Sequence, residues 1–149
     1  MKEKIKIIGE WEVALVSKKT GKILSYDKGH NTIVNTGKEE LAKLLNGISS
    51  TYFRAIAIGE GSTSPTAGDT ALETEVKRSL ATLSYVSDYK ARFTKTFTFG
   101  SGETYDITEA GVFDSDTESG SVMFDRFTFS AKSVDSDVDL KVTVTITIS

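Results

Sequence analysis

The feature that most constrains this sequence is its closing stretch, residues 138–148. Apolar residues occupy every second position there, and threonine or charged residues stand between them. A period of two predicts a β-strand that buries one face and exposes the other. At ~3.4 Å per residue the strand spans roughly 35 Å and needs a neighbour on each side. We therefore predict a sizeable antiparallel sheet built around this strand.

Composition narrows the class of protein. The chain has 149 residues, which fits one domain over residues 1–149, and its 38% hydrophobic and 26% charged content is typical of a folded protein. A net charge of −3 argues against nucleic acid or an anionic membrane as partner. The absence of cysteine excludes disulfides and thiol chemistry. Residues 1–9 lack a signal-peptide apolar run, so we expect synthesis in the cytoplasm without classical export.

Alternating or β-branched segments separated by turns rich in Gly, Asn and Asp predict about nine strands. The predicted strands are residues 4–17 with a kink at 9–10, 23–27, 30–34, 53–58, 79–87, 89–99, 105–113 with a break at 109–111, 121–130 and 138–148. Residues 71–78 fit either a short helix or an extended edge.

One helix is predicted over residues 36–46. Asn35 or Thr36 can cap its start, acidic residues at 39 and 40 oppose the helix dipole, and Asn46-Gly47 is a C-terminal stop signal. Its apolar stripe consists of Leu41, Leu44 and Leu45.

These elements predict a mainly β fold, an antiparallel β-sandwich or flattened barrel of about nine strands with one short α-helix at about 36–46. Residues 1–29 form N-terminal strands in this prediction and can serve as an arm that contacts a neighbouring subunit.

The best candidates for a metal site are Asp135, Asp137 and Asp139. Their alternating spacing matches the first three ligands of a calcium loop, but the sixth and twelfth positions hold Leu140 and Ile146 where an EF-hand needs Gly and Glu. A second acidic turn carries Asp114, Asp116 and Glu118. Solvated turn carboxylates are the simpler interpretation of both, and we expect no metal and no other cofactor.

Catalytic signals are weak. His30 is the only histidine, so it lacks a cysteine or second histidine as partner, and a local hydrogen bond is the better interpretation. The loop 59–70 is rich in small polar residues but lacks the Gly-Lys-Ser/Thr ending of a phosphate loop. We predict that the protein is not an enzyme and has no catalytic residues.

Three stretches together resemble a widespread family of small bacteriophage structural proteins of the tail-fibre-like or decoration type. The first is Asn31-Thr-Ile-Val-Asn-Thr-Gly37 with its helix, and the second is residues 56–76. The third is Ile107-Thr-Glu-Ala-Gly-Val-Phe-Asp114, followed by Met123-Phe-Asp-Arg126 and the closing strand. The resemblance covers roughly residues 30–149. In it, residues 107–113 read as a sharp reversal in which Gly111 permits close backbone approach.

The resemblance implies a non-enzymatic virion protein without bound nucleic acid or membrane. Such proteins usually act as homo-oligomers, often trimers, and we expect a homotrimer that contacts the major capsid protein or tail proteins. A capsid decoration protein is the first expectation. The alternative is a tail-fibre, tail-appendage or adaptor protein that binds a host-surface glycan through loops such as 59–70.

Overall fold

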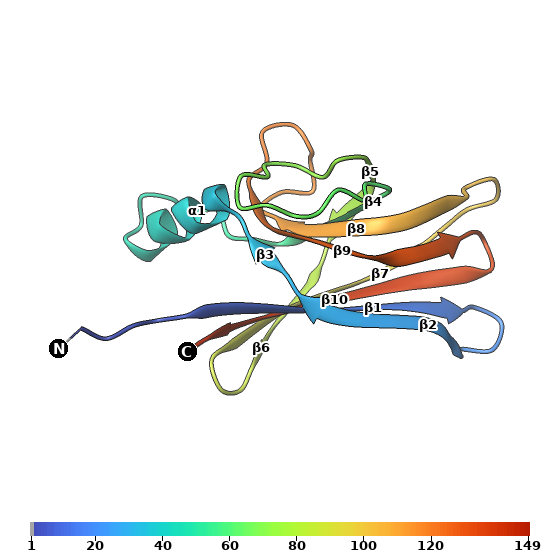
Figure 1. The fold of residues 1–149 in the computed structure, drawn as a ribbon, viewed down its shortest axis with the longest axis horizontal. Coiled ribbons are helices and arrows are strands. Elements are labelled where there is room, and N and C mark those ends of the chain that lie inside the picture. Colours follow the sequence, from blue (N-terminus) through green and yellow to red (C-terminus); the bar gives the residue numbers. More distant parts are fainter. Residues whose placement is uncertain (1) are drawn as a thin grey trace.

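The chain folds into two antiparallel five-stranded sheets packed face to face, with one helix at one end (Figure 1). The computed structural model describes residues 2–149. Its elements are β1 (Ile7–Ser17), β2 (Ile23–His30), β3 (Thr32–Ile33), α1 (Asn35–Leu45), β4 (Ala55–Gly59), β5 (Glu75–Leu80), β6 (Thr82–Val86), β7 (Lys90–Thr98), β8 (Tyr105–Phe113), β9 (Met123–Val134) and β10 (Val138–Ile148).

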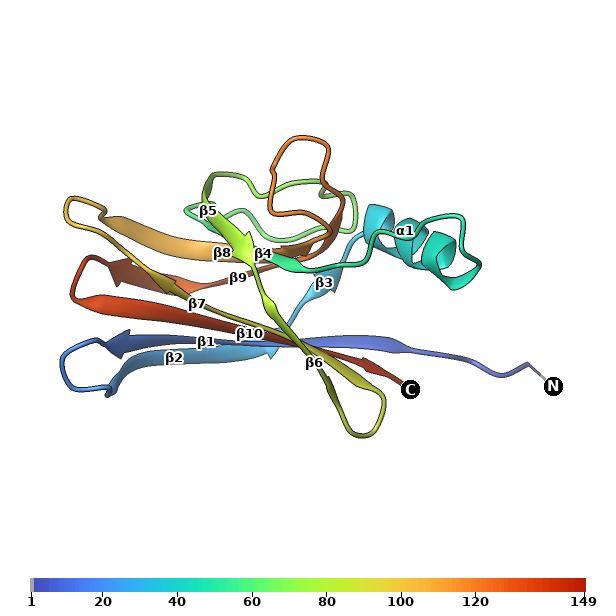
Figure 2. The same ribbon diagram turned by 180° about the vertical axis from the view of Figure 1, so that it is seen from behind.

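The closing strand is the centre of the first sheet, whose order is β2-β1-β10-β7-β6. Strand β10 pairs with β1 from Ser17 to Ile7 on one side and with β7 on the other. The second sheet has the order β3-β9-β8-β4-β5, and the chain crosses between the sheets at Ala81. The view from behind shows β5 leading directly into β6 as the chain descends from the second sheet to the first (Figure 2). The predicted sandwich and its central strand are confirmed.

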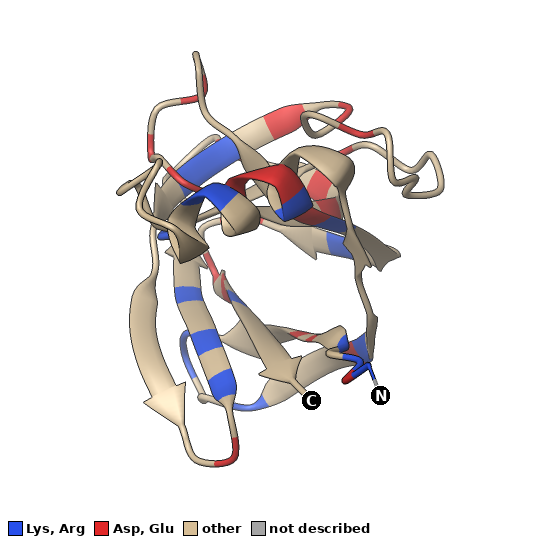
Figure 3. Ribbon diagram, turned by 90° about the vertical axis from the view of Figure 1, so that its left-hand side faces the viewer, with Lys and Arg blue, Asp and Glu red and all other residues tan. Residues whose placement is uncertain are grey.

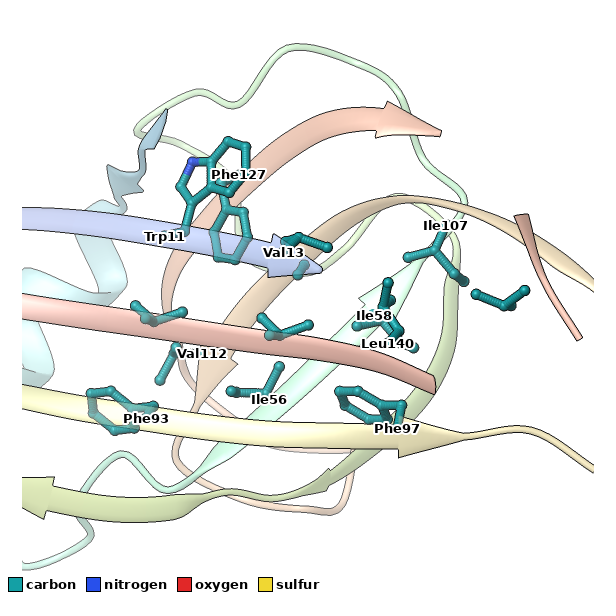
Figure 4. Close-up of a cluster of buried hydrophobic side chains, with 14 of the residues drawn as sticks. Trp11, Val13, Ile56, Ile58, Phe93, Phe97, Ile107, Val112, Phe127 and Leu140 are labelled. Carbon is teal, nitrogen blue, oxygen red and sulfur yellow. The ribbon is translucent and has the colours of Figure 1, made fainter. Parts of the chain in front are cut away.

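The core lies between the facing sides of the sheets (Figure 4). Val142 and Val144 of β10 and Ile56 and Ile58 of β4 are all fully buried in this core. The Trp11 ring stacks on Phe127 from the other sheet, with centroids 5.1 Å apart and planes 10° from parallel. Each such buried side chain contributes about 1.5–3 kcal/mol, so this layer holds the sheets together.

Several predicted strand boundaries were wrong. Residues 7–17 and 105–113 form continuous strands, because Gly9, Glu10 and Gly111 pair in register within the ladders. The register shifts lie between Leu15 and Val16 in β1 and on either side of the predicted break in β8, between Ile107 and Glu109 and between Val112 and Phe113. The segment 107–113 is therefore no reversal. Residues 75–80 are extended, which settles the question left open by the sequence.

The helix was predicted to within one residue at each end, but its capping differs. Val34 is the N-cap, no side chain caps the start, and the first turn holds no acidic residue. Thr36 Oγ1 donates to the Met123 carbonyl of β9 at 3.2 Å and so ties the helix to the sheet. Asn46 ends the helix, and Gly47 follows with φ +79° as the stop signal predicted.

Candidate interaction surface

A fully buried carboxylate, Glu109, organises the loop between β4 and β5. Its Oε2 accepts the Gly61 and Thr74 amides at 2.7 and 2.8 Å, and its Oε1 accepts the Glu73 amide at 2.9 Å. The Arg126 Nε donates to Oε1 at 3.0 Å. A buried charge with this many donors is satisfied, so Glu109 acts as a structural acceptor that fixes both ends of the loop.

Arg126 extends the Glu109 hydrogen-bond network to the β4–β5 loop. Its Nη1 lies 3.1 Å from Asp69 Oδ2, and Asp69 in turn accepts the amide and hydroxyl of Thr66. The Asn35 amide of α1 donates to the Ala67 carbonyl at 2.8 Å. The loop is thus held against both the sheet and the helix.

Asp125 is a second fully buried acid, on β9. Its Oδ1 accepts the Val112 amide at 2.8 Å, and its Oδ2 accepts from the Asn31 amide nitrogen at the corner between β2 and β3. Desolvation raises the pKa of Asp125 to about 7 in spite of these two hydrogen bonds. This carboxyl group therefore changes protonation near neutral pH.

Lys132 is a buried cation at the side of the sandwich. Its Nζ lies 2.9 Å from Asp27 Oδ2 on β2 and 2.8 Å from Ser130 Oγ. Hydrogen bonds from Ser130 and Lys132 hold the pKa of Asp27 below its usual value. The contact joins one strand of each sheet, so its role is structural.

The structure does not gather the predicted calcium ligands into one site. Asp135 Oδ1 accepts the Asp137 amide in the turn before β10, while Asp139 lies in the strand and is 3.8 Å from Lys18. The second acidic turn already holds a cation, because Arg78 donates to the Ser115 and Thr117 carbonyls. Among residues 2–149, no group of three or more His, Asp or Glu side chains is placed to hold a metal ion.

His30 ends β2 with an exposed side chain, and its carbonyl accepts the Trp11 indole N–H at 3.1 Å. It borders a cleft of about 590 Å³ on the outer face of the first sheet. Acidic and basic side chains both line this cleft: Glu10, Glu12, Lys28, Lys90 and Arg92. Mixed signs along a solvated sheet face are consistent with an ordinary polar surface.

The most unusual surface is a hollow of about 570 Å³ at the helix end of the sandwich, here called the mouth groove. Figure 3 looks into this end, where α1 lies above the first sheet and both termini emerge. Among the described residues that line it, Lys90 is the one that carries a charge. The groove is lined by Leu41, Leu44, Tyr52, Phe53, Tyr85, Tyr89, Lys90, Ala91, Phe93, Phe124, Ile146 and Ile148.

Two tyrosines stand at the rim of the mouth groove on the β6–β7 hairpin. Tyr85 and Tyr89 are 73% and 72% exposed, and the Tyr89 amide donates to the Tyr85 hydroxyl. Asp88 and Tyr89 have φ of 64° and 66°. The left-handed conformation is uncommon for a bulky aromatic residue and costs about 1 kcal/mol or more. The hairpin thus holds both rings at the rim.

Beside the groove, the end of α1 projects two apolar side chains, here called the helix knob. Leu45 is 91% exposed and Ile48 is 75% exposed. The predicted apolar stripe was therefore partly wrong, because Leu41 and Leu44 pack on the core and Leu45 does not. The sequence already indicated this difference. Leu44 and Leu45 are adjacent, and adjacent side chains of a helix point about 100° apart, so both are not expected to face the core.

Comparison with protein-family models, curated proteins and solved structures finds no match to this chain. No helix within residues 2–149 is both long and apolar enough to cross a membrane.

Proposed function

We propose that this protein is a non-enzymatic structural component of a bacteriophage particle, most specifically an accessory decoration protein of the capsid. The observation that carries the proposal is the apolar helix end, where the mouth groove and the helix knob lie together at one end of the sandwich. Contiguous exposed apolar surface of this kind marks a protein–protein contact.

The buried charges support a structural role. The hydrogen bonds of Glu109 and Arg126 hold the β4–β5 loop, and the ion pair of Lys132 with Asp27 joins two strands. These groups serve to keep the sandwich rigid, which suits a protein that must present a fixed surface to a neighbour. The three stretches that resemble phage structural proteins give the proposal its biological setting.

The test is the copy number of the protein in purified particles of the phage that encodes it, measured by quantitative mass spectrometry against the major capsid protein. We expect hundreds of copies per particle. A few dozen copies or fewer would move the protein to the tail, and its absence from the particle would overturn the virion role.

A tail appendage or adaptor that binds a host glycan is the second candidate. The polar cleft on the first sheet favours it, because hydrogen-bonding groups of both kinds line a concave surface. Binding of the purified protein to host-surface polysaccharide, lost in Arg92→Ala and kept in the control Arg54→Ala, would support this candidate over capsid decoration.

A further inference from the structure

We propose that the mouth groove is a self-association surface, and that the helix knob of a second copy of this chain occupies it. The contact is a property of the purified chain, whereas its purpose, joining copies within a particle, rests on the proposed function. The argument uses the groove, the knob, their charges and their placement.

The groove needs an apolar occupant from outside its own chain. Leu41 and Leu44 of α1 already form one wall, and Ala91 and Ile146 of the first sheet form another. A hollow of about 570 Å³ between these walls leaves apolar side chains facing water. Water in such a groove gains few hydrogen bonds, so burial against apolar groups is favourable.

The helix knob has the chemistry to fill the groove but cannot enter its own. Leu45 and Ile48 stand almost fully in solvent in the folded chain. Gly47 lies between them with φ +79° and nothing within 4 Å of its Cβ position, so the chain turns freely outward at this point. An apolar projection and an apolar hollow on the same end make a self-complementary surface.

Side chains of both signs surround this end, which favours a copy of the same chain over a partner whose surface is only acidic or only basic. The N-terminal segment that runs out past the sheet is mainly basic, with Lys2, Lys4 and Lys6 against the single acid Glu3. Asp88 lies on the β6–β7 hairpin and Glu40 on the helix. Figure 3 shows both signs around the open end. Two like ends can therefore meet with opposite charges facing each other.

The rim residues fit a contact between proteins. Tyr52, Tyr85 and Tyr89 surround the groove, and tyrosine is among the residues enriched in such interfaces. The knob and the groove lie side by side on each copy. Each copy can therefore insert its knob into the groove of one neighbour and accept the knob of a neighbour in its own groove, which closes a small ring or a two-fold pair.

The first experiment measures the mass of the purified chain by light scattering up to about 0.1 mM, where a contact of micromolar Kd is populated. We expect an oligomer for the wild type and monomers for Leu45→Glu in the knob and Ala91→Arg in the groove. The control is Leu24→Glu, an exposed residue of β2 at the opposite end, which should stay oligomeric. A monomeric wild type, or an oligomer unaffected by both variants, would overturn the proposal.

The second experiment uses the lack of cysteine in the chain. Leu45→Cys and Tyr85→Cys are made in separate, distinguishable chains, mixed and oxidised. We expect a mixed disulfide between them and none when Leu24→Cys replaces Leu45→Cys. Absence of the mixed product would contradict knob-in-groove contact. A monomer present at high copy number in particles would overturn this interface alone, and an oligomer absent from particles would overturn only the virion role.

Discussion

At the scale of single residues, this sandwich places charges where apolar side chains are usual. Glu109, Asp125, Arg126 and Lys132 are each at most 2% exposed. A buried charge is tolerated when partners satisfy it, and removing one partner is costlier than removing both. Two of these residues therefore give sharp tests of how the fold is held.

Glu109→Gln should destabilise the protein by about 3 kcal/mol, because the amide loses the charge that faces Arg126 and offers an N–H where backbone donors already point. Urea unfolding measures the change. The exposed Glu118→Gln should stay within about 0.5 kcal/mol of wild type. Hydrogen exchange at the Gly61 and Thr74 amides should accelerate in the first variant, and unchanged exchange there would contradict the assigned role.

Asp125 should make the free energy of unfolding fall as the pH rises from about 4 to about 7. Its folded pKa of about 7 lies above the usual 3.8, so the folded state holds a proton that the unfolded state has lost. The associated stability is present below pH 3.8 and disappears as the pH rises through 7. Asp125→Asn should remove about 2–3 kcal/mol of this decline from pH 5 to 8.

Unfolding midpoints in urea at several pH values measure this effect. The exposed Asp116→Asn serves as the control and should keep the wild-type slope. A slope in Asp125→Asn equal to that of the wild type would mean that another group causes the pH dependence.

At the scale of elements, the short helix depends on its contact with the second sheet. An 11-residue helix is marginal on its own, and it lacks both a side-chain N-cap and acidic residues in its first turn. Gly37 lets it lie directly on β9, because an added Cβ would be 2.5 Å from the Phe124 carbonyl oxygen. Close packing here outweighs the helix propensity that glycine lacks.

Gly37→Ala should therefore destabilise the protein by about 1–3 kcal/mol, although alanine is the better helix former. Thermal unfolding followed by circular dichroism measures the change. Lys38→Ala, at the exposed neighbouring position, should alter stability by less than about 0.5 kcal/mol. A more stable Gly37→Ala variant would show that the helix can shift off β9 without cost.

At the scale of the whole molecule, the asymmetry between the two ends decides how the protein meets others. The end opposite the helix closes with the turns that join β1 to β2, β7 to β8 and β9 to β10, whereas the helix end leaves the mouth groove open (Figures 1 and 3). Within residues 2–149, α1 is the one helix at that end and leaves the groove open. The proposed occupant is the helix knob of a second copy.

Self-association should make the melting temperature rise with protein concentration, because a partner that binds only the folded state stabilises it by mass action. Differential scanning fluorimetry over a hundredfold range of concentration measures this. Leu45→Glu should melt at one temperature throughout, and Leu24→Glu should behave like the wild type. A wild-type melting temperature independent of concentration would argue against assembly in solution.

The sequence by itself determined the class of fold, the central strand 138–148 and the place of the helix, because local periodicity carries those signals. Only the tertiary structure decided that Gly9 and Gly111 lie inside continuous strands. Pairing with the neighbouring strands keeps the backbone extended at these positions, although glycine by itself favours a break. The tertiary structure likewise assembled the Glu109 network and the mouth groove, whose residues come from segments far apart in the chain. Contacts of that kind depend on strand pairing within the second sheet and on the packing of the two sheets, and no local pattern specifies them.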